Sequence, residues 1–249
     1  MSEDQLPHLG NNSRDRLTSG LRAILGAAPF AGAALGEVVS NIIPEQRLDR
    51  LVKYIELLEE RVKGLEAELL HERFTSPEGV DILEDSFHLA IRAYTHERTE
   101  YIANVVANGF MQEEIDYSET KRMLWLLGQL SDVEVIVLRG TWSKGYRNQD
   151  SEKAFQDKHK AILFPDPLCP TMSEKQRREV ILISSYNDNL VALSLLTRVY
   201  RQDLTREIPD FNHATRAMEV EGHEITTLGM MLLDYLEMIP EWASKQHPY

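Results

Sequence analysis

The sequence is short of cysteine, of positive charge and of long apolar runs, and each shortage excludes a class of protein. Its 249 residues include one cysteine, Cys169, so no internal disulfide can form, which suits a reducing compartment. The 27 Lys and Arg residues are outnumbered by 40 Asp and Glu residues, and the formal net charge of −13 repels nucleic acid and anionic lipid at long range. The longest uncharged apolar run, residues 23–36, is shorter than the roughly 20 residues that a membrane-spanning helix needs.

Motifs that carry chemistry are also missing. The sequence contains no glycine-rich phosphate loop and no Gly-x-Ser-x-Gly nucleophile turn, and Cys169 has no basic neighbour that would activate its thiol. His88 and His96 each have a glutamate four residues away, a spacing found in the metal sites of helical bundles. Such a site also needs a matching motif on a second helix, which the sequence does not offer. We therefore predict a non-enzymatic chain without a metal or a cofactor, and we interpret these histidines as surface residues.

Composition divides the chain into four parts. Residues 1–16 are polar, lack the apolar core of a secretory signal and are expected to be flexible. Residues 17–44 form a Gly/Ala-rich apolar segment, and residues 45–117 are predicted to form a coiled-coil helical hairpin. Residues 118–249 are predicted to form a second domain with a long insertion at 141–172. We expect a cytoplasmic protein, with a position at the inner membrane as the alternative.

The Gly/Ala-rich segment has two interpretations. It contains Gly26, Phe30, Gly32 and Gly36, and the spacing of the last two glycines matches the small-residue faces on which helices approach closely. Pro29 breaks the run, so we expect two short helices. These helices either contact a membrane or pack together as a close core pair, and the sequence leaves both alternatives open.

The stretch at 45–72 carries a regular apolar repeat. Apolar residues recur at steps of three and four over three heptads, and most of the other positions are Glu, Arg or Lys. The seam consists of Leu48, Leu51, Ile55, Leu58, Val62, Leu65 and Leu69. Such a seam needs a partner, either a second copy of the chain or the following helix, and we predict that the chain self-associates through it.

Capping signals mark the following helices. Ser76 with Pro77 begins a helix that we expect to run for about 30 residues, to end at Asn108-Gly109 and to lie antiparallel on the heptad helix. Ser131 with Glu134 predicts one capping box, and Ser173 with Gln176 predicts another.

The end of the chain predicts a winged-helix domain. Glu221-Gly222 is typical of a two-residue hairpin turn, and Thr226 or Thr227 then caps an apolar helix that ends before Pro240. Helices followed by a tight hairpin and a capped terminal helix are the order of a winged helix. We assign residues 131–138 and 189–200 to its helix-turn-helix pair. The predicted fold class is therefore mainly α, with a coiled-coil hairpin and a winged-helix-like domain that holds one small β-hairpin.

Three stretches resemble the abortive-infection alpha (Abi-alpha) type proteins of bacteria. They are "LWLLGQLSDVEVIVL", "NLVALSLLTRVYR" and "HEITTLGMMLLDYL", the last with a Thr-x-x-Gly start to its helix. The resemblance covers about residues 40–140 and 185–239, and the insertion at 141–172 departs from it. It implies phage defence by growth arrest and supplies no enzymatic chemistry. In this interpretation the Gly/Ala-rich segment is the membrane effector and the winged-helix half senses or restrains it.

The basic residues of the second half are candidates for nucleic-acid contacts. They are Lys175, Arg177, Arg178, Arg198 and Arg201. Interspersed acidic residues dilute this patch, so nucleic acid is disfavoured as a partner and a protein, a membrane or a second copy is preferred. We interpret Trp125, Trp142 and Trp242 as packing residues. The alternative function is a winged-helix regulator or scaffold that acts by protein binding or weak DNA binding.

Overall fold

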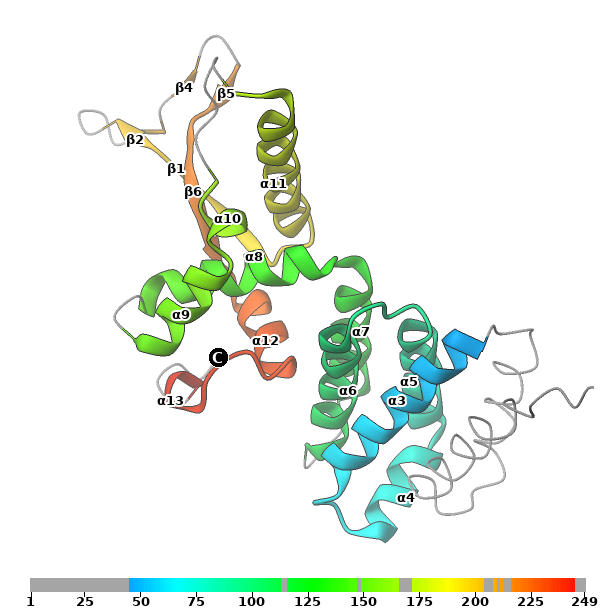
Figure 1. The fold of residues 1–249 in the computed structure, drawn as a ribbon. Helices are drawn as coiled ribbons and strands as arrows, with labels where there is room; N and C mark the ends of the chain where they lie inside the picture. Colours follow the sequence, from blue (N-terminus) through cyan, green and yellow to red (C-terminus); the bar gives the residue numbers. More distant parts are fainter. Residues whose placement is uncertain are drawn as a thin grey trace, which may run out of the picture. The chain divides into compact units, whose positions relative to one another are not determined.

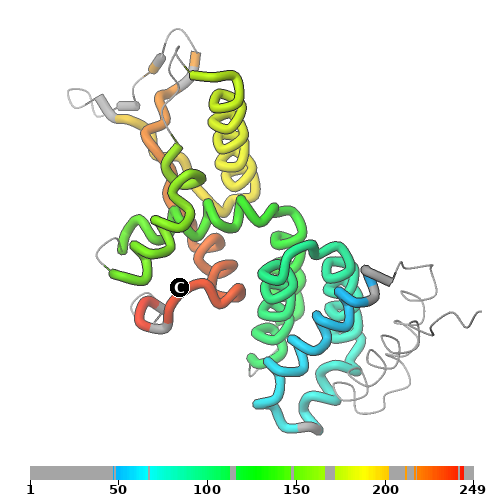
Figure 2. The backbone as a smooth tube through the Cα atoms, viewed as in Figure 1, coloured from blue at the N-terminus to red at the C-terminus, as the bar shows by residue number. Residues whose placement is uncertain are grey.

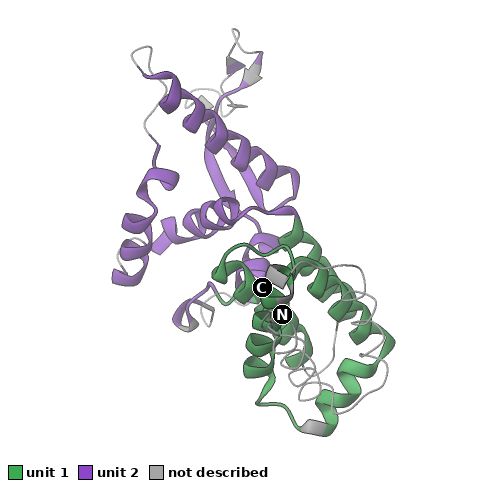
Figure 3. Ribbon diagram, turned by 45° about the vertical axis from the view of Figure 1, so that its right-hand side comes forward, with its two compact units in different colours: residues 1–128, 235–237 green, residues 129–234, 238–249 purple. Residues whose placement is uncertain are grey.

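The computed structural model describes residues 45–112, 116–146, 149–165, 172–203, 208–209, 211–212 and 216–244. The described chain is mainly helical, with one small two-stranded antiparallel sheet and two shorter strand pairs (Figure 1). The predicted mainly helical class is confirmed. The chain divides into unit 1, residues 1–128 with 235–237, and unit 2, residues 129–234 with 238–249 (Figure 3).

The described part of unit 1 is a set of helices. Their bounds are α3 (Glu45–Val62), α4 (Ala67–Thr75), α5 (Pro77–Ala90), α6 (His96–Met111) and α7 (Tyr117–Gln129). Helices α3 and α5 both pack on α6, and α4 packs on α5. Aromatic rings fill this core, since Phe74 stacks on Phe110 at a centroid distance of 4.4 Å and Tyr54 meets Phe87 edge-on at 6.1 Å. Burial raises the pKa of Tyr54, whose hydroxyl donates a hydrogen bond to Ser86 Oγ over 2.8 Å.

The heptad seam is covered from within the chain. Leu51, Ile55, Leu58 and Val62 are at most 1% exposed, on the helix that packs on α6. The helix ends at Val62 rather than continuing through the last heptad, and Leu65 and Leu69 beyond it are half-buried. The side chain of Leu48 lies outside the described residues. A helix of the same chain therefore suffices to bury the centre of the seam, and self-association through it stays a prediction.

The long helix expected after Ser76 is two helices. Helix α5 ends at Ala90, and hydrogen bonds from Arg92 N–H to Leu89 O and from Ala93 N–H to Ala90 O tighten the chain into a turn. Thr95 then caps α6 by accepting a hydrogen bond from Arg98 N–H over 3.1 Å. The prediction of a single helix is therefore wrong. The Thr95 cap begins a new helix, although the apolar residues on both sides of it keep the spacing of one longer helix.

The predicted stop at Asn108-Gly109 is also wrong. Helix α6 continues to Met111, and Gly109 lies inside it where α6 approaches α7. A Cβ atom built on Gly109 would lie 2.4 Å from Thr120 Oγ1. This glycine therefore permits close helix packing instead of ending the helix.

Polar side chains on α6 hold residues 235–237, which belong to unit 1. Asn104 Nδ2 donates to Leu236 O over 2.9 Å, and Asn108 Nδ2 donates to Tyr235 O over 3.0 Å. One turn further, Gln112 Nε2 contacts the hydroxyl of Tyr235 over 2.6 Å, and this hydroxyl donates to Glu119 Oε1 over 2.7 Å. Burial and Glu119 raise the pKa of Tyr235, so its phenol stays a neutral donor.

A charged cluster joins α5 to α7. Lys121 Nζ lies 2.8 Å from Asp81 Oδ2 and is also paired with Asp85, and the hydroxyl of Tyr117 donates to Asp81. These hydrogen bonds lower the pKa of Asp81. Both carboxylates are more than 40% exposed, so solvent screens the cluster and its contribution to stability is modest.

Unit 2 combines helices with the antiparallel strands. Its elements are α8 (Asp132–Ser143), η1 (Lys144–Tyr146), α9 (Asp150–Lys158), α10 (Lys160–Leu163), α11 (Glu174–Ala192), β1 (Leu196–Tyr200), β2 (Gln202–Asp203), β3 (Ile208–Pro209), β4 (Phe211–Asn212), β5 (Ala217–Met218), β6 (Val220–Ile225), α12 (Thr227–Tyr235) and α13 (Glu241–Ser244). The region expected as a long insertion at 141–172 contains the end of α8 together with η1, α9 and α10.

Strand pairing in unit 2 corrects two predictions. Strand β1 pairs antiparallel with β6, with Leu196 opposite Ile225 and Tyr200 opposite Val220. Residues 221–222 therefore lie within β6 and form no hairpin turn. Residues 196–200 are a strand, so the segment 189–200 is not the second helix of a helix-turn-helix pair. Helix α11 runs unbroken to Ala192 (Figure 2).

The helix caps agree with the sequence. Ser76 accepts from Gly79 N–H and has Pro77 at the first helical position. Both capping boxes form, Ser131 with Glu134 at α8 and Ser173 with Gln176 at α11. These predictions are confirmed because a cap depends only on residues within one turn.

Replacing Gly109 with Ala is expected to destabilise unit 1 by about 1–3 kcal/mol, since the added methyl overlaps the buried Thr120 side chain. The matched control is Gly64→Ala, because a Cβ at Gly64 has no atom within 4 Å. Urea denaturation of both variants measures the difference. An unchanged midpoint for Gly109→Ala would show that α6 and α7 do not approach this closely.

Replacing Leu58 with Asp is expected to cost unit 1 several kcal/mol, because an unpaired carboxylate would enter the core. The loss should be independent of protein concentration if α6 covers the seam, and concentration-dependent if a second chain does. Lys53→Asp, on the exposed side of α3, is the control. A Leu58→Asp protein of halved mass by light scattering with unchanged helix content would instead assign the seam to a second copy.

Candidate interaction surface

The long helix α11 is anchored at its C-terminal end. Leu190 is fully buried, and the N–H of Leu195 returns to Leu190 O over 2.9 Å, which closes the helix with a tight turn. Ser194 occupies the left-handed position of this turn at φ 62°. The chain then enters β1 in a direction set by the turn.

Thr226 and Gly229 fasten the start of α12 to this turn. The Thr226 hydroxyl donates to Ser194 O over 2.7 Å, and its backbone N–H donates to Leu195 O over 3.1 Å. The same hydroxyl accepts from Gly229 N–H over 3.0 Å, which confirms the predicted cap. A Cβ on Gly229 would lie 2.4 Å from Leu195 O, so only glycine fits here without a shift. The Thr-x-x-Gly pattern therefore connects the start of α12 to the turn that ends α11.

A second anchor comes from the capping box of α8. Asn189 Nδ2 on α11 donates to Glu134 Oε1 over 2.6 Å. The other oxygen of Glu134 accepts from both the N–H and the hydroxyl of Ser131 over 2.7 Å. One carboxylate thus caps α8 and holds the last turns of α11.

The remaining length of α11 is open. Leu190 is its only buried residue, although the helix has 19 residues. Ile181 and Leu182 are 56% and 51% exposed, in the middle of the helix. An apolar run at this position predicts burial, so its exposure marks a candidate contact surface.

Most of the predicted nucleic-acid contacts are neutralised by carboxylates. On α11, Arg178 is paired with Glu174, and Lys175 lies 3.9 Å from Glu179.

The two candidate arginines in and after β1 are also paired with carboxylates. Arg198 lies 2.6 Å from Asp188 Oδ1, and Arg201 lies 3.0 Å from Glu219 Oε2. Arg177 alone among the five candidates has no ion pair with a described residue. The structure spreads these residues over α11, β1 and the residue after β1, and each paired cation has its charge balanced locally.

A buried ion pair fixes α9 beside α8. The guanidinium of Arg139 makes two hydrogen bonds to the carboxylate of Glu152, at 2.6 and 2.8 Å, and the two side chains are 7% and 1% exposed. The guanidinium also lies over the rings of Trp142 and Phe155 at 4.4 and 5.0 Å. Because this ion pair is bidentate and desolvated, it fixes the position of α9 against α8.

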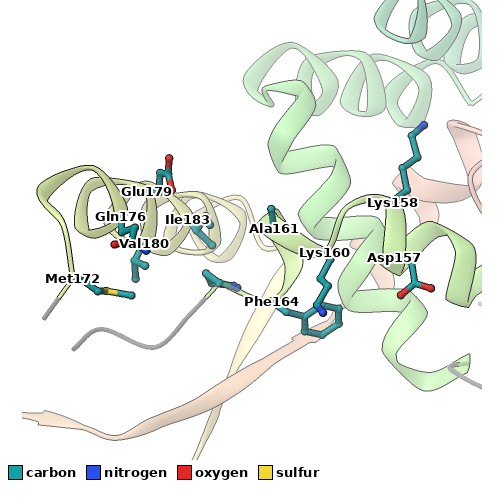
Figure 4. A pocket seen from close by; sticks show the side chains of 11 residues that line it. Asp157, Lys158, Lys160, Ala161, Phe164, Met172, Gln176, Glu179, Val180 and Ile183 are labelled. Atoms are coloured by element: carbon teal, nitrogen blue, oxygen red, sulfur yellow. The ribbon is translucent and has the colours of Figure 1, made fainter.

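A cavity of about 540 Å³ lies between α11 and the α9–α10 segment (Figure 4). Its apolar lining consists of Ala161, Phe164, Pro165, Met172, Val180 and Ile183, and its polar lining consists of Asp157, Lys158, Lys160, Gln176 and Glu179. The α11 residues recur at steps of three and four and therefore share one helix face. Burial, with a smaller effect of Lys158, lowers the pKa of the neighbouring His159.

Other predicted features are placed elsewhere or lie outside the described residues. His96 Nε2 lies 3.4 Å from Glu100 as an ordinary helix-surface contact, and His88 is exposed on a different helix. Trp125 is 48% exposed, with the Arg122 guanidinium 4.5 Å from its ring centre, so its interpretation as a packing residue is wrong.

The two other tryptophans do pack, since Trp142 and Trp242 both contact the ring of Tyr146. Gly26, Phe30, Gly32, Gly36 and Cys169 lie outside the described residues. Within the part of the chain that the structure describes, no helix combines the length and apolar character needed to cross a membrane. The same part contains no group of three or more His, Cys, Asp or Glu side chains suited to a metal ion.

Comparison with protein-family models, with curated proteins and with solved structures finds no match for this chain. Function must therefore be argued from the residues and from the geometry of the candidate surface.

Removing one charge of the buried Arg139–Glu152 pair should destabilise unit 2. Glu152→Gln and Arg139→Met each leave the other partner buried without its counter-charge, and we expect a loss of about 3–5 kcal/mol. Arg178→Met, which removes an exposed ion pair on α11, is the control and should change stability little. Chemical denaturation followed by tryptophan fluorescence measures this, because Trp142 lies against Arg139. Equal effects at both pairs would contradict the structural importance of the α8–α9 contact.

Proposed function

We propose that this chain is a non-enzymatic bacterial antiviral component of the abortive-infection type, whose unit 2 is a winged-helix module that binds protein. The resemblance of residues 40–140 and 185–239 to Abi-alpha type proteins supports the antiviral part. The exposed apolar residues of α11 carry the protein-binding part.

The order of elements supports a winged helix. The long helix α11 is followed by β1, then by the short strands β2–β5, and then by β6, which returns to pair with β1. Helix α12 begins directly after β6 at the Thr226 cap. In a winged helix, a helix in the position of α11 is the element that reaches a partner.

The chemistry of α11 favours a protein over nucleic acid. A helix that reads DNA presents cations and hydrogen-bonding groups to phosphates and base edges. Here Arg178 and Lys175 are paired with carboxylates, and Ile181 and Leu182 are large apolar residues exposed at mid-helix. Apolar side chains on an otherwise polar exposed helix are typical of protein interfaces.

The proposal assigns residues 17–43 the role of an effector at the inner membrane and keeps self-association as a property of the chain. The Gly/Ala composition of this segment and the spacing of Gly32 and Gly36 support the assignment. Unit 2 then senses a trigger or restrains the effector by binding another protein.

A second candidate function is a winged-helix regulator that binds DNA weakly. Arg177 favours it, because this arginine is exposed on α11 and has no ion pair with a described residue. With the other four candidate cations paired, such binding would be weak and strongly salt-dependent.

Expression in bacteria with phage challenge tests the proposal. We expect growth arrest or protection with the full chain, recovery of the chain in the membrane fraction, and loss of both on deletion of residues 17–43. The matched variants are Gly32→Leu and Gly36→Leu, which add apolar surface while blocking close helix approach. They should stay with the membrane and lose the phenotype. If they are soluble with a lowered melting temperature, residues 17–43 are scaffold and the effector assignment is wrong.

A further inference from the structure

Helix α11 carries an exposed stripe with the spacing of a helix-pair seam. Its positions recur at steps of four and three, which places them on one face of the helix, and every one of them is exposed. They are Glu174, Arg178, Ile181, Ser185, Asp188 and Ala192. With 3.6 residues per turn, the buried Leu190 and the cavity-lining Ile183 lie on the opposite face, so the stripe is on the outer side of α11.

The charges of α11 balance, unlike those of the chain as a whole. The helix has three cations and three carboxylates, namely Lys175, Arg177, Arg178, Glu174, Glu179 and Asp188. The complete chain has a net charge of −13. All three cations lie in the first half of the helix, and the second half contains Asp188 alone. A strongly charged partner therefore gains little here, whereas a second α11 in the antiparallel direction sets the more positive half against the negative half.

One antiparallel register matches the stripe to itself. It places Arg178 opposite Asp188 of the second copy, and two-fold symmetry repeats this contact at the other end. In the centre Ile181 lies opposite Ser185, whose small side chain leaves room for a close approach of the two helix axes. The neighbouring Leu182 is 51% exposed and widens this apolar centre.

This register extends ion pairs that the single chain already makes. Arg178 contacts Glu174, and Asp188 Oδ1 lies 2.6 Å from Arg198. Bringing Arg178 of one copy to Asp188 of the other joins the two pairs into one row. On each side of the two-fold axis the charges alternate in sign, in the order Glu174, Arg178, Asp188 and Arg198. A network of this kind contributes more than isolated exposed pairs do.

We infer that α11 pairs antiparallel with α11 of a second copy of this chain, and that this contact carries self-association. The inference rests on the proposed function, in which the chain self-associates, and it names the surface. The centre of the α3 seam is already buried within one chain, since Ile55 and Leu58 are at most 1% exposed. Two 19-residue helices form a small interface, so the dimer should be weak and dissociate on dilution.

Analytical ultracentrifugation of the full chain over a range of micromolar concentrations tests the inference. Ile181→Asp places a carboxylate in the apolar centre and should preserve the fold, because Ile181 is 56% exposed. The matched control is Met218→Asp, at an apolar residue of β5 that is 50% exposed and lies outside α11. Melting temperatures verify that the variants fold.

Charge reversal tests the register. Arg178→Asp and Asp188→Arg each set like charges against one another in a homodimer, and each should weaken the dimer at least tenfold. An equimolar mixture of these two variants has opposite charges at both contacts of the mixed dimer and should recover the association. Arg201→Asp, which reverses one charge of the exposed pair with Glu219 outside α11, is the control.

We expect the original chain and both controls to form dimers at the upper concentrations and Ile181→Asp to sediment as a monomer. A dimer that survives Ile181→Asp, or two charge variants that do not recover on mixing, would overturn the inference and leave self-association intact. A monomeric original chain at every concentration would contradict both the inference and the self-association in the proposed function.

Discussion

The geometry of unit 2 depends on the joint that Thr226 makes with the turn after α11. One hydroxyl accepts from Gly229 at the start of α12 and donates to Ser194 at the end of α11. These bonds lie at the point where β1 begins and β6 ends, so they also set the register in which Leu196 faces Ile225. Because α11 has a single buried residue, this joint and the Asn189–Glu134 bond determine the direction in which the rest of the helix projects.

Local features of this fold could be predicted from the sequence, and non-local ones could not. The caps at Ser76, Ser131, Ser173 and Thr226 follow from residues within one turn of each other. Glu221-Gly222 reads as a hairpin turn by composition, yet pairing with β1 holds it in a continuous strand. The β1–β6 pairing joins residues 20 to 29 positions apart, and no pattern within β6 alone reveals its partner.

The predicted helix end at Gly109 was wrong for a related reason. A glycine is a stop signal only when the chain needs a left-handed residue, and Gly109 instead serves a close approach to Thr120 from the next helix. The heptad pattern likewise predicts that Leu51 and Ile55 are buried but is silent on which helix buries them. Here α6 of the same chain packs on their helix, which accounts for complete burial without a second copy.

Sequence periodicity did not reveal the exposed apolar residues of α11, because that argument assigns apolar residues to the protein interior. The run Val180–Ile183 occupies nearly the whole circumference of α11, so no orientation of the helix could bury all four side chains against one neighbour. Val180 and Ile183 line the cavity, and Ile181 and Leu182 remain outside. Exposing two large apolar residues costs solubility and adds nothing to the packing of unit 2. Glu174 and Glu179 offset cations near the start of the same helix, so the exposed apolar pair is the feature of α11 that supports the proposed protein partner.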